Sequence, residues 1–447
     1  MSGKNFNFYR KFVLGADDNV PLFDGTSVTG INFDNAATTP PLYSVIKDTL
    51  KFSNYYSSIH RGEGYKSRLS TMLYDKSRID VGNFVNFDKD KMDVIFVKNC
   101  TEAINKLSNI LFRGNHNDVI LSTFMEHHSN DLPWRGKYIV DYVQINNKGN
   151  LILEDLEDKL KKYNGNVRLV TVTGASNVTG QKNNVHLIAK LAHKYNAKIL
   201  VDGAQLIPHS PLDLKPYYSN EHIDFVAFSA HKMYAPFGCG VLIGPKNFFE
   251  SVNPDYVGGG TIDFVMHGFV KWTKSPEKHE AGTPNVLGAV ALSSAIKTLA
   301  AFGMDDIESY ERLLTEYLTR NLLLIPKVIL YGDYLNCNNK VSIVSFNIEG
   351  VRHNTLAKIL SLEFGIAVRS GCFCAQPYMQ KLLKITREES VSYINQPKET
   401  YPGTVRVSLG MYNTINEIDR FLYAISAVSK NTEYYLKKYQ NTNNILY

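Results

Sequence analysis

The sequence contains few cysteines and no long apolar run. The five cysteines, Cys100, Cys239, Cys337, Cys372 and Cys374, are an odd number in a chain of 447 residues. This argues against a disulfide framework and fits a reducing compartment. No stretch approaches the roughly eighteen apolar residues of a membrane-spanning helix, and the opening MSGKNFNFYRKFVLG lacks the apolar core of a secretory signal. We therefore expect a cytoplasmic protein that does not enter a membrane.

The sequence also lacks a large excess of one charge. Its 49 lysines and arginines against 43 aspartates and glutamates give a net charge of +6, and they form no basic block long enough to follow a nucleic-acid backbone. Nucleic acid is therefore not an expected partner. The 44% hydrophobic and 21% charged residues are typical of a folded chain rather than a disordered one. The length exceeds that of one simple core and predicts at least two lobes.

From about residue 94 the sequence alternates short apolar runs with helical patterns. VIFV precedes KNCTEAINKLSNIL, RLVTVTG precedes ASNVTG, and KILVDG precedes AQLIPHS. Apolar strands that alternate with helices indicate a mostly parallel sheet covered by helices on both faces. Ligands of such sheets bind beyond the carboxyl ends of the strands.

The pattern changes after a long helix predicted within AGTPNVLGAVALSSAIKTLAAFG. The strand-like segments KVSIVSFNIEG and TVRVSLGMYNT flank a helix predicted over 354–364. We therefore expect an α/β protein with two domains. The large domain would comprise residues 31–305, and a smaller α+β domain would comprise residues 1–30 together with 306–447.

Two charged residues stand at strand ends of the predicted parallel sheet. Lys232 follows the strand in DFVAFSAHK, where an enclosed amine can have its pKa lowered and form a Schiff base. Taken alone, such a lysine is more often an ordinary surface residue. Asp202 ends the apolar run ILVD, where a buried carboxylate needs a cationic partner. The protonated pyridine of pyridoxal phosphate is one such partner, whereas helix capping would explain Asp202 without the lysine motif.

An anion seat and a histidine pair follow other strands of this sheet. Thr101 and Glu102 open the helix after VIFV, where unpaired N–H groups and the helix dipole bind an anion. Such openings also cap many helices. His127 and His128 follow DVILSTFME, where an imidazole can lie on an aromatic ring or take a proton. Adjacent histidines lack the spacing of a zinc site, so we expect no bound metal.

In this order, these segments resemble the class V branch of fold type I pyridoxal phosphate enzymes, in particular group II cysteine desulfurases and selenocysteine lyases. INFDNAATTPP, SSIHRGEGYKSRLST, VGGGTI, HEAGTPN and RVSLGMYNT extend the resemblance over nearly the whole chain. The resemblance implies a fold type I transferase that uses pyridoxal 5'-phosphate. It also implies a homodimer whose two subunits share each active site.

The resemblance implies a role for each matching residue. Lys232 would be the Schiff-base lysine and general base, Asp202 the partner of the pyridinium nitrogen, and His127 the ring that stacks on the cofactor. The other cofactor contacts would be Thr101, Glu102, Asn177, Gln205, Ser229 and His231, with Gly260, Thr261 and Thr283 of the partner subunit. The substrate contacts would be His60, Arg61, Asn177, Arg369 and Arg406, of which Arg406 is the better candidate for bidentate carboxylate capture.

The stretch RSGCFCAQP places two thiols close to Arg369. Free cysteine is ordinarily a small buried filler, but group II desulfurases carry their nucleophile five residues after the arginine of this motif. The resemblance therefore implies that Cys374 is the nucleophile, with Arg369 favouring its thiolate. Cys372 is expected to be a spectator, with a sulfur relay and a resolving thiol as alternatives. A disulfide between the two would be strained at this spacing.

The reaction implied by the resemblance converts L-cysteine to L-alanine and leaves a persulfide on Cys374 for a sulfur-acceptor protein. Class V also contains other C–S lyases, selenocysteine lyases, aminotransferases and epimerases. An irregular insertion predicted around 380–405, beside the mouth of the site, motivates such an activity on another amino acid as the alternative. A non-enzymatic sulfur-carrier scaffold is the third interpretation, and the intact set of Lys232, Asp202 and His127 argues against it.

Overall fold

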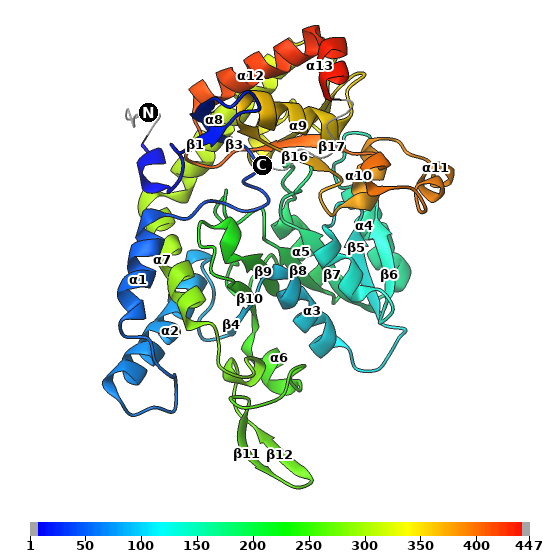
Figure 1. Ribbon diagram of the computed structural model, residues 1–447. Coiled ribbons are helices and arrows are strands. Elements are labelled where there is room, and N and C mark those ends of the chain that lie inside the picture. Colours follow the sequence, from blue (N-terminus) through cyan, green and yellow to red (C-terminus); the bar gives the residue numbers. More distant parts are fainter. Residues whose placement is uncertain (1–7, 440–447) are drawn as a thin grey trace.

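The computed structural model describes residues 8–439 and contains one large, mostly parallel sheet (Figure 1). Its strand order is β4-β10-β9-β8-β7-β5-β6. Neighbours from β9 to β6 are parallel, whereas β10 is antiparallel to both β4 and β9. The predicted mostly parallel sheet is confirmed. The bounds are β4 Met92–Val97, β5 Val119–Thr123, β6 Ile139–Val143, β7 Val167–Thr173, β8 Lys198–Asp202, β9 Phe225–Ser229 and β10 Gly240–Pro245.

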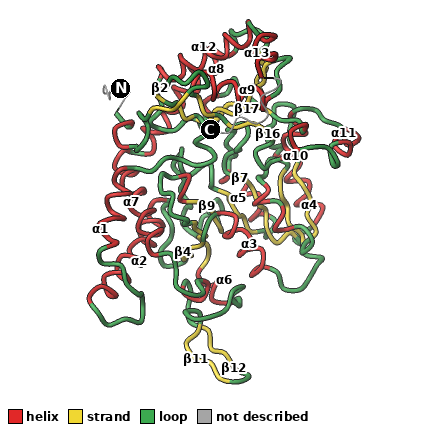
Figure 2. The backbone as a smooth tube through the Cα atoms, viewed as in Figure 1, coloured by secondary structure: helices red, strands yellow, loops and turns green. Residues whose placement is uncertain are grey.

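Helices cover both faces of this sheet, as Figure 2 shows around its central strands. Alternate residues of β9 enter different cores: Phe225 and Ala227 pack in the cluster that contains α3, and Val226 and Phe228 in the cluster that contains α2, α5 and α7. Because these strands are buried on both faces of the sheet, their sequences are continuous apolar runs. The helices are α1 Tyr43–Ser53, α2 Tyr65–Phe84, α3 Cys100–Leu111, α4 Leu153–Tyr163, α5 Val185–Lys194, α6 Lys246–Ser251 and α7 Val286–Phe302.

A second, antiparallel sheet has the order β13-β14-β17-β16 and its own apolar core. The bounds are β13 Val328–Tyr331, β14 Ile343–Ile348, β16 Arg369–Gly371 and β17 Thr404–Ser408, with helices α8 Met304–Leu322, α9 His353–Phe364, α12 Ile415–Lys430 and α13 Thr432–Tyr439. We propose from these two sheets the division into residues 31–305 and residues 1–30 with 306–447. Residues 1–7 and 440–447 of the smaller part lie outside the described residues.

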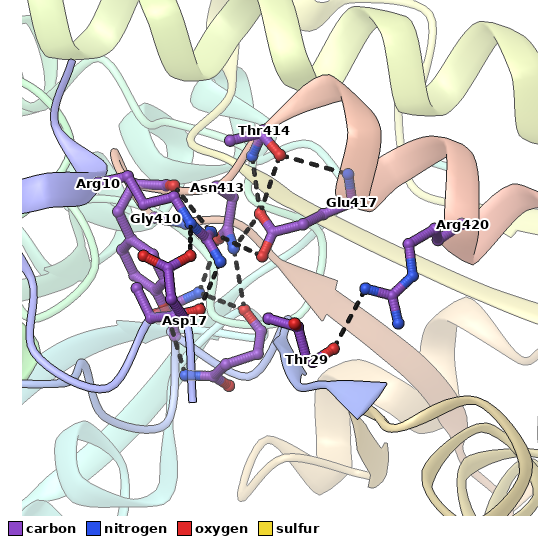
Figure 3. Close-up of polar contacts among 12 residues, drawn as sticks. Arg10, Asp17, Thr29, Gly410, Asn413, Thr414, Glu417 and Arg420 are labelled. Atoms are coloured by element: carbon purple, nitrogen blue, oxygen red, sulfur yellow. Dashed lines mark hydrogen bonds and ion pairs between the residues drawn. The ribbon is translucent and has the colours of Figure 1, made fainter. Parts of the chain in front are cut away.

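The N-terminal segment is tied to the second sheet's helices, as Figure 3 shows. Arg10 donates to Glu417 at 2.8 Å, and Glu417 forms a capping box with Thr414 at the start of α12. Arg420 of the same helix donates to the carbonyl of Thr29 at 3.1 Å. These contacts support the proposal that the first 30 residues belong with the C-terminal part. The segment also contains β1 Asn19–Pro21, β2 Ser27–Thr29 and β3 Ile31–Asn32, which pairs in parallel with β15 Ile366–Ala367.

The insertion predicted around 380–405 is more ordered than the sequence pattern indicated. It contains the end of α10 Gln376–Leu382, all of α11 Arg387–Ser392 and a short 3₁₀ turn at Lys398–Thr400. The side chain of Thr386 caps α11 together with Glu389, which is the S/T-x-x-E signature of a helix start. The prediction of irregular structure is therefore wrong for residues 387–392. A separate hairpin, β11 Ile262–Met266 with β12 Phe269–Trp272, projects from the lower end of the molecule in Figure 1.

Within residues 8–439, no single helix is long and apolar enough to cross a membrane. The helices α7 and α8 reach the length and composition only as a pair, and they are bent by 77° at the break between them. Most of the apolar residues of α7 are instead buried in the larger core.

Candidate active site

A cavity of about 240 Å³ opens at the carboxyl ends of β7, β8 and β9, the edge at which parallel sheets bind ligands. The second sheet supplies its other wall through the segments around β16 and β17. The cavity therefore joins residues more than 300 positions apart in the sequence. The lining includes six residues predicted to carry chemistry, namely His127, Asp202, Lys232, Arg369, Cys374 and Arg406.

Asp202 and Lys232 come from the ends of neighbouring strands. Asp202 is the last residue of β8 and is 4% exposed. Its Oδ1 accepts the N–H of Ala204 at 3.0 Å and the thiol of Cys100 at 3.4 Å, and no ion pair reaches it within residues 8–439. Burial raises the pKa of Asp202, against the effects of Ala204 and Lys232. Burial likewise lowers the pKa of Lys232, against the charge of Asp202, so desolvation disfavours the charged form of both groups.

The two histidines that line the cavity are neutral at physiological pH. Burial lowers the pKa of His127 to about 3, and the charge of Lys232 adds to the effect. Burial lowers the pKa of His231 to about 4, again helped by Lys232. The Nδ1 atom of His127 accepts the backbone N–H of Ser129 at 3.1 Å, which orients its ring. A neutral, oriented imidazole is suited to stacking on an aromatic ligand.

The start of α3 forms a polar seat beside these groups. Thr101 and Ser229 line the cavity; the hydroxyl of Thr101 lies 2.7 Å from that of Ser129, and the hydroxyl of Ser229 accepts the N–H of Cys100 at 2.8 Å. Glu102 does not join this seat. Its carboxylate accepts the N–H of Lys98 at 2.5 Å, and its side chain lines a different cavity.

Gln205 has an unused hydrogen-bonding atom in the cavity wall. Its Nε2 donates to the carbonyl of Ala36 at 2.7 Å, whereas its Oε1 is buried without a hydrogen-bond partner among the described residues. A buried polar atom left in this state costs about 1–3 kcal/mol. The side chain is therefore fixed in place by one end and leaves the other end for a ligand that donates a hydrogen bond.

Asp34 connects the two arginines of the site and was not identified from the sequence. Arg406 is 3% exposed; its Nη2 donates to Asp34 at 3.1 Å and its Nη1 to the carbonyl of Asn177 at 2.8 Å. Burial lowers the pKa of Arg406 to about 10. Arg369 is exposed and reaches Asp34 at 3.4 Å. Asp34 follows a short strand in INFDNAATTPP, and its position at a strand end is the sequence feature that could have identified it as a site residue. The Nε of Arg406 is buried without a hydrogen-bond partner among the described residues, and each Nη carries a second N–H, so the guanidinium keeps donors for bidentate carboxylate capture.

Cys374 lies in a strained turn at the rim of the cavity. The N–H of Ala375 donates to the carbonyl of Cys372 at 3.0 Å, while Phe373 and Cys374 have φ angles of 54° and 55°. A turn with positive φ at both central residues is type I′, which normally uses glycine or asparagine. Two side-chain-bearing residues there cost about 1–2 kcal/mol each.

The two thiols of this turn differ in position. Cys374 is exposed and lines the cavity, whereas Cys372 is partly buried, does not line it, and has its pKa raised by burial. Asn177, predicted as a ligand contact, lines the cavity but uses its amide to donate to the carbonyl of Phe373 at 2.7 Å. Arg406 lies over the ring of Phe373 at 4.7 Å from its centroid. The sequence motif indicated the thiols but not the turn that separates them.

The remaining predicted site residues do not line this cavity. His60 and Arg61 are exposed, and His60 lies 3.5 Å from Asp75. The other residues lie near the base of the β11–β12 hairpin, where the N–H of Gly282 donates to the carbonyl of Gly259 at 2.8 Å and joins two segments. The residues on these segments are Gly260, Thr261 and Thr283, and their contribution to a partner's cavity stays a prediction.

Comparison with known proteins agrees with this architecture and site. The family model for class V aminotransferases matches residues 31–421, and the chain therefore belongs to the class V aminotransferase family. More particularly, it is 35% identical over 413 residues to a probable cysteine desulfurase of Pyrococcus abyssi, covering 90% of this chain and 94% of that protein. A probable cysteine desulfurase of Synechocystis sp. is 34% identical over 408 residues, with 89% and 90% covered.

Two solved structures share the fold. The apo structure of a cysteine desulfurase from Thermococcus onnurineus has a TM-score of 0.80 and 32% identity, and the match covers 90% of this chain and 95% of that one. The cysteine desulfurase CsdA of Escherichia coli, in an S-sulfonic acid form, has a TM-score of 0.79 and 27% identity, with 96% and 99% covered. The expected fold type I architecture is confirmed by these likenesses.

Proposed function

We propose that this protein is a pyridoxal phosphate-dependent cysteine desulfurase. The observation that carries the proposal is that the thiol of Cys374 lines the same cavity as Lys232 and Asp202. The proposed reaction converts L-cysteine to L-alanine and leaves a persulfide on Cys374, which then passes its outer sulfur to an acceptor protein. The names of the similar proteins support the same activity.

The residues present fit pyridoxal 5'-phosphate. Lys232 would hold its aldehyde group, and Asp202, a buried carboxylate without a cation, would pair with the protonated pyridine nitrogen. The Oε1 of Gln205, which has no partner among the described residues, would accept a hydrogen bond from the phenolic hydroxyl group. His127 would stack on the ring. The seat formed by Thr101, Ser229 and His231 would take the phosphate at the start of α3. When bound, the cofactor supplies an electron sink that stabilises charge at the substrate α-carbon.

The substrate is bound by charge and cleaved by the thiol. Arg369 and Arg406 supply positive charge for the substrate carboxylate. The lowered pKa of Lys232 favours the free amine that would take the α-proton and later return a proton to Cβ. The thiolate of Cys374 attacks the substrate sulfur. A sulfur–sulfur bond forms and the substrate carbon–sulfur bond breaks. Cβ then takes one proton and the α-carbon regains one, which completes L-alanine.

We propose a homodimer that completes the site. The segments with Gly260, Thr261 and Thr283 do not line their own cavity and adjoin an exposed hairpin, and they would reach the phosphate of the partner subunit's cofactor. None of the five thiols is paired in a disulfide, which fits the reducing, cytoplasmic compartment that we continue to expect. The chemistry of the persulfide calls for an acceptor with a free thiol.

Product identification tests the proposal. Purified protein loaded with pyridoxal phosphate is incubated with L-cysteine and a thiol reductant, and alanine, sulfide, pyruvate and keto acids are measured. Equal amounts of alanine and sulfide are expected. Cys374→Ala should abolish most of this turnover, and Cys372→Ala is the matched control that should retain it. Pyruvate or a keto acid in place of alanine, or full activity of Cys374→Ala, would overturn the proposed mechanism.

A further inference from the structure

The adjacent residues His127 and His128 have different surroundings. The ring of His127 lines the cavity, whereas that of His128 does not. The two ring centroids are 6.3 Å apart at an angle of 46°, so the neighbouring side chains point into different surroundings. The role implied for His127 therefore leaves His128 unexplained.

His128 contacts the chain on both sides of the peptide that follows Cys374. Its backbone N–H donates to the carbonyl of Cys374 at 2.6 Å. Its ring atom Nε2 accepts the backbone N–H of Gln376 at 3.2 Å. These contacts close around Ala375 and fix the end of the strained turn from which the thiol of Cys374 extends. On the other side of the turn, the side chain of Asn177 donates to the backbone carbonyl of Phe373.

The contact with Gln376 requires one form of the imidazole. An atom that accepts an N–H must carry a free lone pair, so Nε2 is unprotonated and the proton of the neutral ring lies on Nδ1. Burial lowers the pKa of His128, and Arg135 adds to this effect while Asp131 opposes it. The neutral form that the geometry requires is therefore also the form that the surroundings favour.

A turn with positive φ at two non-glycine residues is strained and needs contacts with the surrounding structure to keep its conformation. Relaxation of Phe373 and Cys374 to ordinary backbone angles would redirect the thiol away from the cavity. We propose that His128 is a positioning residue for the proposed desulfuration, whose Nε2 holds the turn so that the thiol of Cys374 faces the substrate sulfur. The inference rests on the proposed function and adds to it a residue that touches neither cofactor nor substrate.

The test compares two variants of the full chain loaded with pyridoxal phosphate. His128→Leu removes the acceptor at similar volume, and His128→Gln keeps one, because its Oε1 can occupy the place of Nε2. The measurements are the single-turnover rate of alanine formation at saturating L-cysteine, the KM for L-cysteine, and the rate at which iodoacetamide alkylates Cys374, located by peptide mapping. Visible absorption of the bound cofactor reports whether the cofactor site is intact.

His128→Leu is expected to slow alanine formation by about tenfold to 100-fold, with unchanged cofactor absorption and little change in KM. Its alkylation rate at Cys374 is expected to change as the turn relaxes, and His128→Gln should remain within about threefold of the wild type in both rates. Wild-type rates in His128→Leu, or equal impairment of both variants, would overturn the inference. Absence of alanine from the wild type would instead overturn the proposed function, and the alkylation result would still decide the role of His128 in holding the turn.

Discussion

Two buried aspartates on neighbouring strands have opposite surroundings. Asp202 ends β8 and Asp224 immediately precedes β9, so they lie at opposite ends of this strand pair. Both are nearly inaccessible, at 4% and 2% exposure. Asp224 accepts from Lys198 at 3.0 Å, from His193 at 2.8 Å and from the N–H of Ile199 at 3.0 Å. Asp202 accepts only an N–H and a thiol and has no cation among the described residues.

The pKa values follow this difference. Hydrogen bonds and charges from His193, His222 and Lys198 hold the pKa of Asp224 far below its ordinary value despite its burial, whereas burial raises the pKa of Asp202. Removal of a buried carboxylate that is paired and hydrogen-bonded leaves its partners uncompensated and destabilises the fold. A buried carboxylate without such partners is available to a ligand. The end of the sheet that contains Asp224 is therefore structural, and the end that contains Asp202 is the functional one.

The largest expected effect comes from Asp202→Asn, which removes the partner proposed for the pyridinium nitrogen. Alanine formation from L-cysteine should fall about 100-fold to 1,000-fold, the range that corresponds to loss of one member of a buried charge pair. The free energy of unfolding of the cofactor-free protein should be unchanged or slightly increased, because no ion pair is broken. Steady-state kinetics and urea unfolding measure the two quantities. Near-normal turnover in Asp202→Asn would contradict the functional role assigned to Asp202.

Asp224→Asn should lower the stability of the protein and leave its turnover nearly unchanged, the reverse of Asp202→Asn. Removing the charge leaves Lys198 and His193 without their partner, and the free energy of unfolding should fall by about 3 kcal/mol. Turnover per folded molecule, measured well below the unfolding temperature, should stay close to the wild-type value. A strong loss of turnover without loss of stability would show that this end of the sheet is also functional.

The pH dependence of stability should distinguish the members of the Asp224 cluster. The pKa of Asp224 is depressed, so its contribution is present above about pH 4 and is lost as the pH falls. The pKa of His193 is raised by Asp224 and the carbonyl of Asn220 against the effect of burial. Its contribution is therefore present below about pH 6.5 and is lost as the pH rises. His193→Gln should cost about 1 kcal/mol more at pH 5.5 than at pH 9 in urea unfolding, and an equal cost at both pH values would contradict the assignment.

The smallest effect is expected at Glu102, which the sequence placed in the cofactor site and the structure places outside the cavity. Glu102→Gln should leave the affinity for pyridoxal phosphate within about twofold of the wild type and cost about 0.5–1 kcal/mol of stability through the start of α3. Thr101→Val is the matched comparison at the adjacent, cavity-lining position and should weaken binding more. Cofactor titration followed by visible absorption gives both affinities.

The parts of the site predicted from sequence are those carried by single strands. Asp202 and Lys232 follow apolar runs, and strand ends of a parallel sheet meet at one edge, so their convergence with His127 could be expected. The helices after GTPN and over 354–364 were likewise clear from periodicity, and α7 and α9 occupy those segments.

The parts that could not be predicted depend on contacts between distant segments. Asp34 meets Arg369 and Arg406 because β3 pairs with β15 while β16 pairs with β17, a register that no local pattern specifies. The positive φ angles of Phe373 and Cys374 run against local preference, since neither residue favours that conformation. Strain of this kind is held by the surrounding structure and is therefore absent from the sequence signal.

The most direct test of the account is to locate the sulfur after one turnover. Protein loaded with pyridoxal phosphate is mixed with L-cysteine without reductant, quenched by alkylation, digested and analysed by mass spectrometry. One additional sulfur atom is expected on Cys374, in an amount equal to the alanine formed, with none on Cys372. Alanine formed while Cys374 stays unmodified, or the additional sulfur on Cys372 in a Cys374→Ala variant that still turns over, would contradict the assignment of Cys374 as the nucleophile.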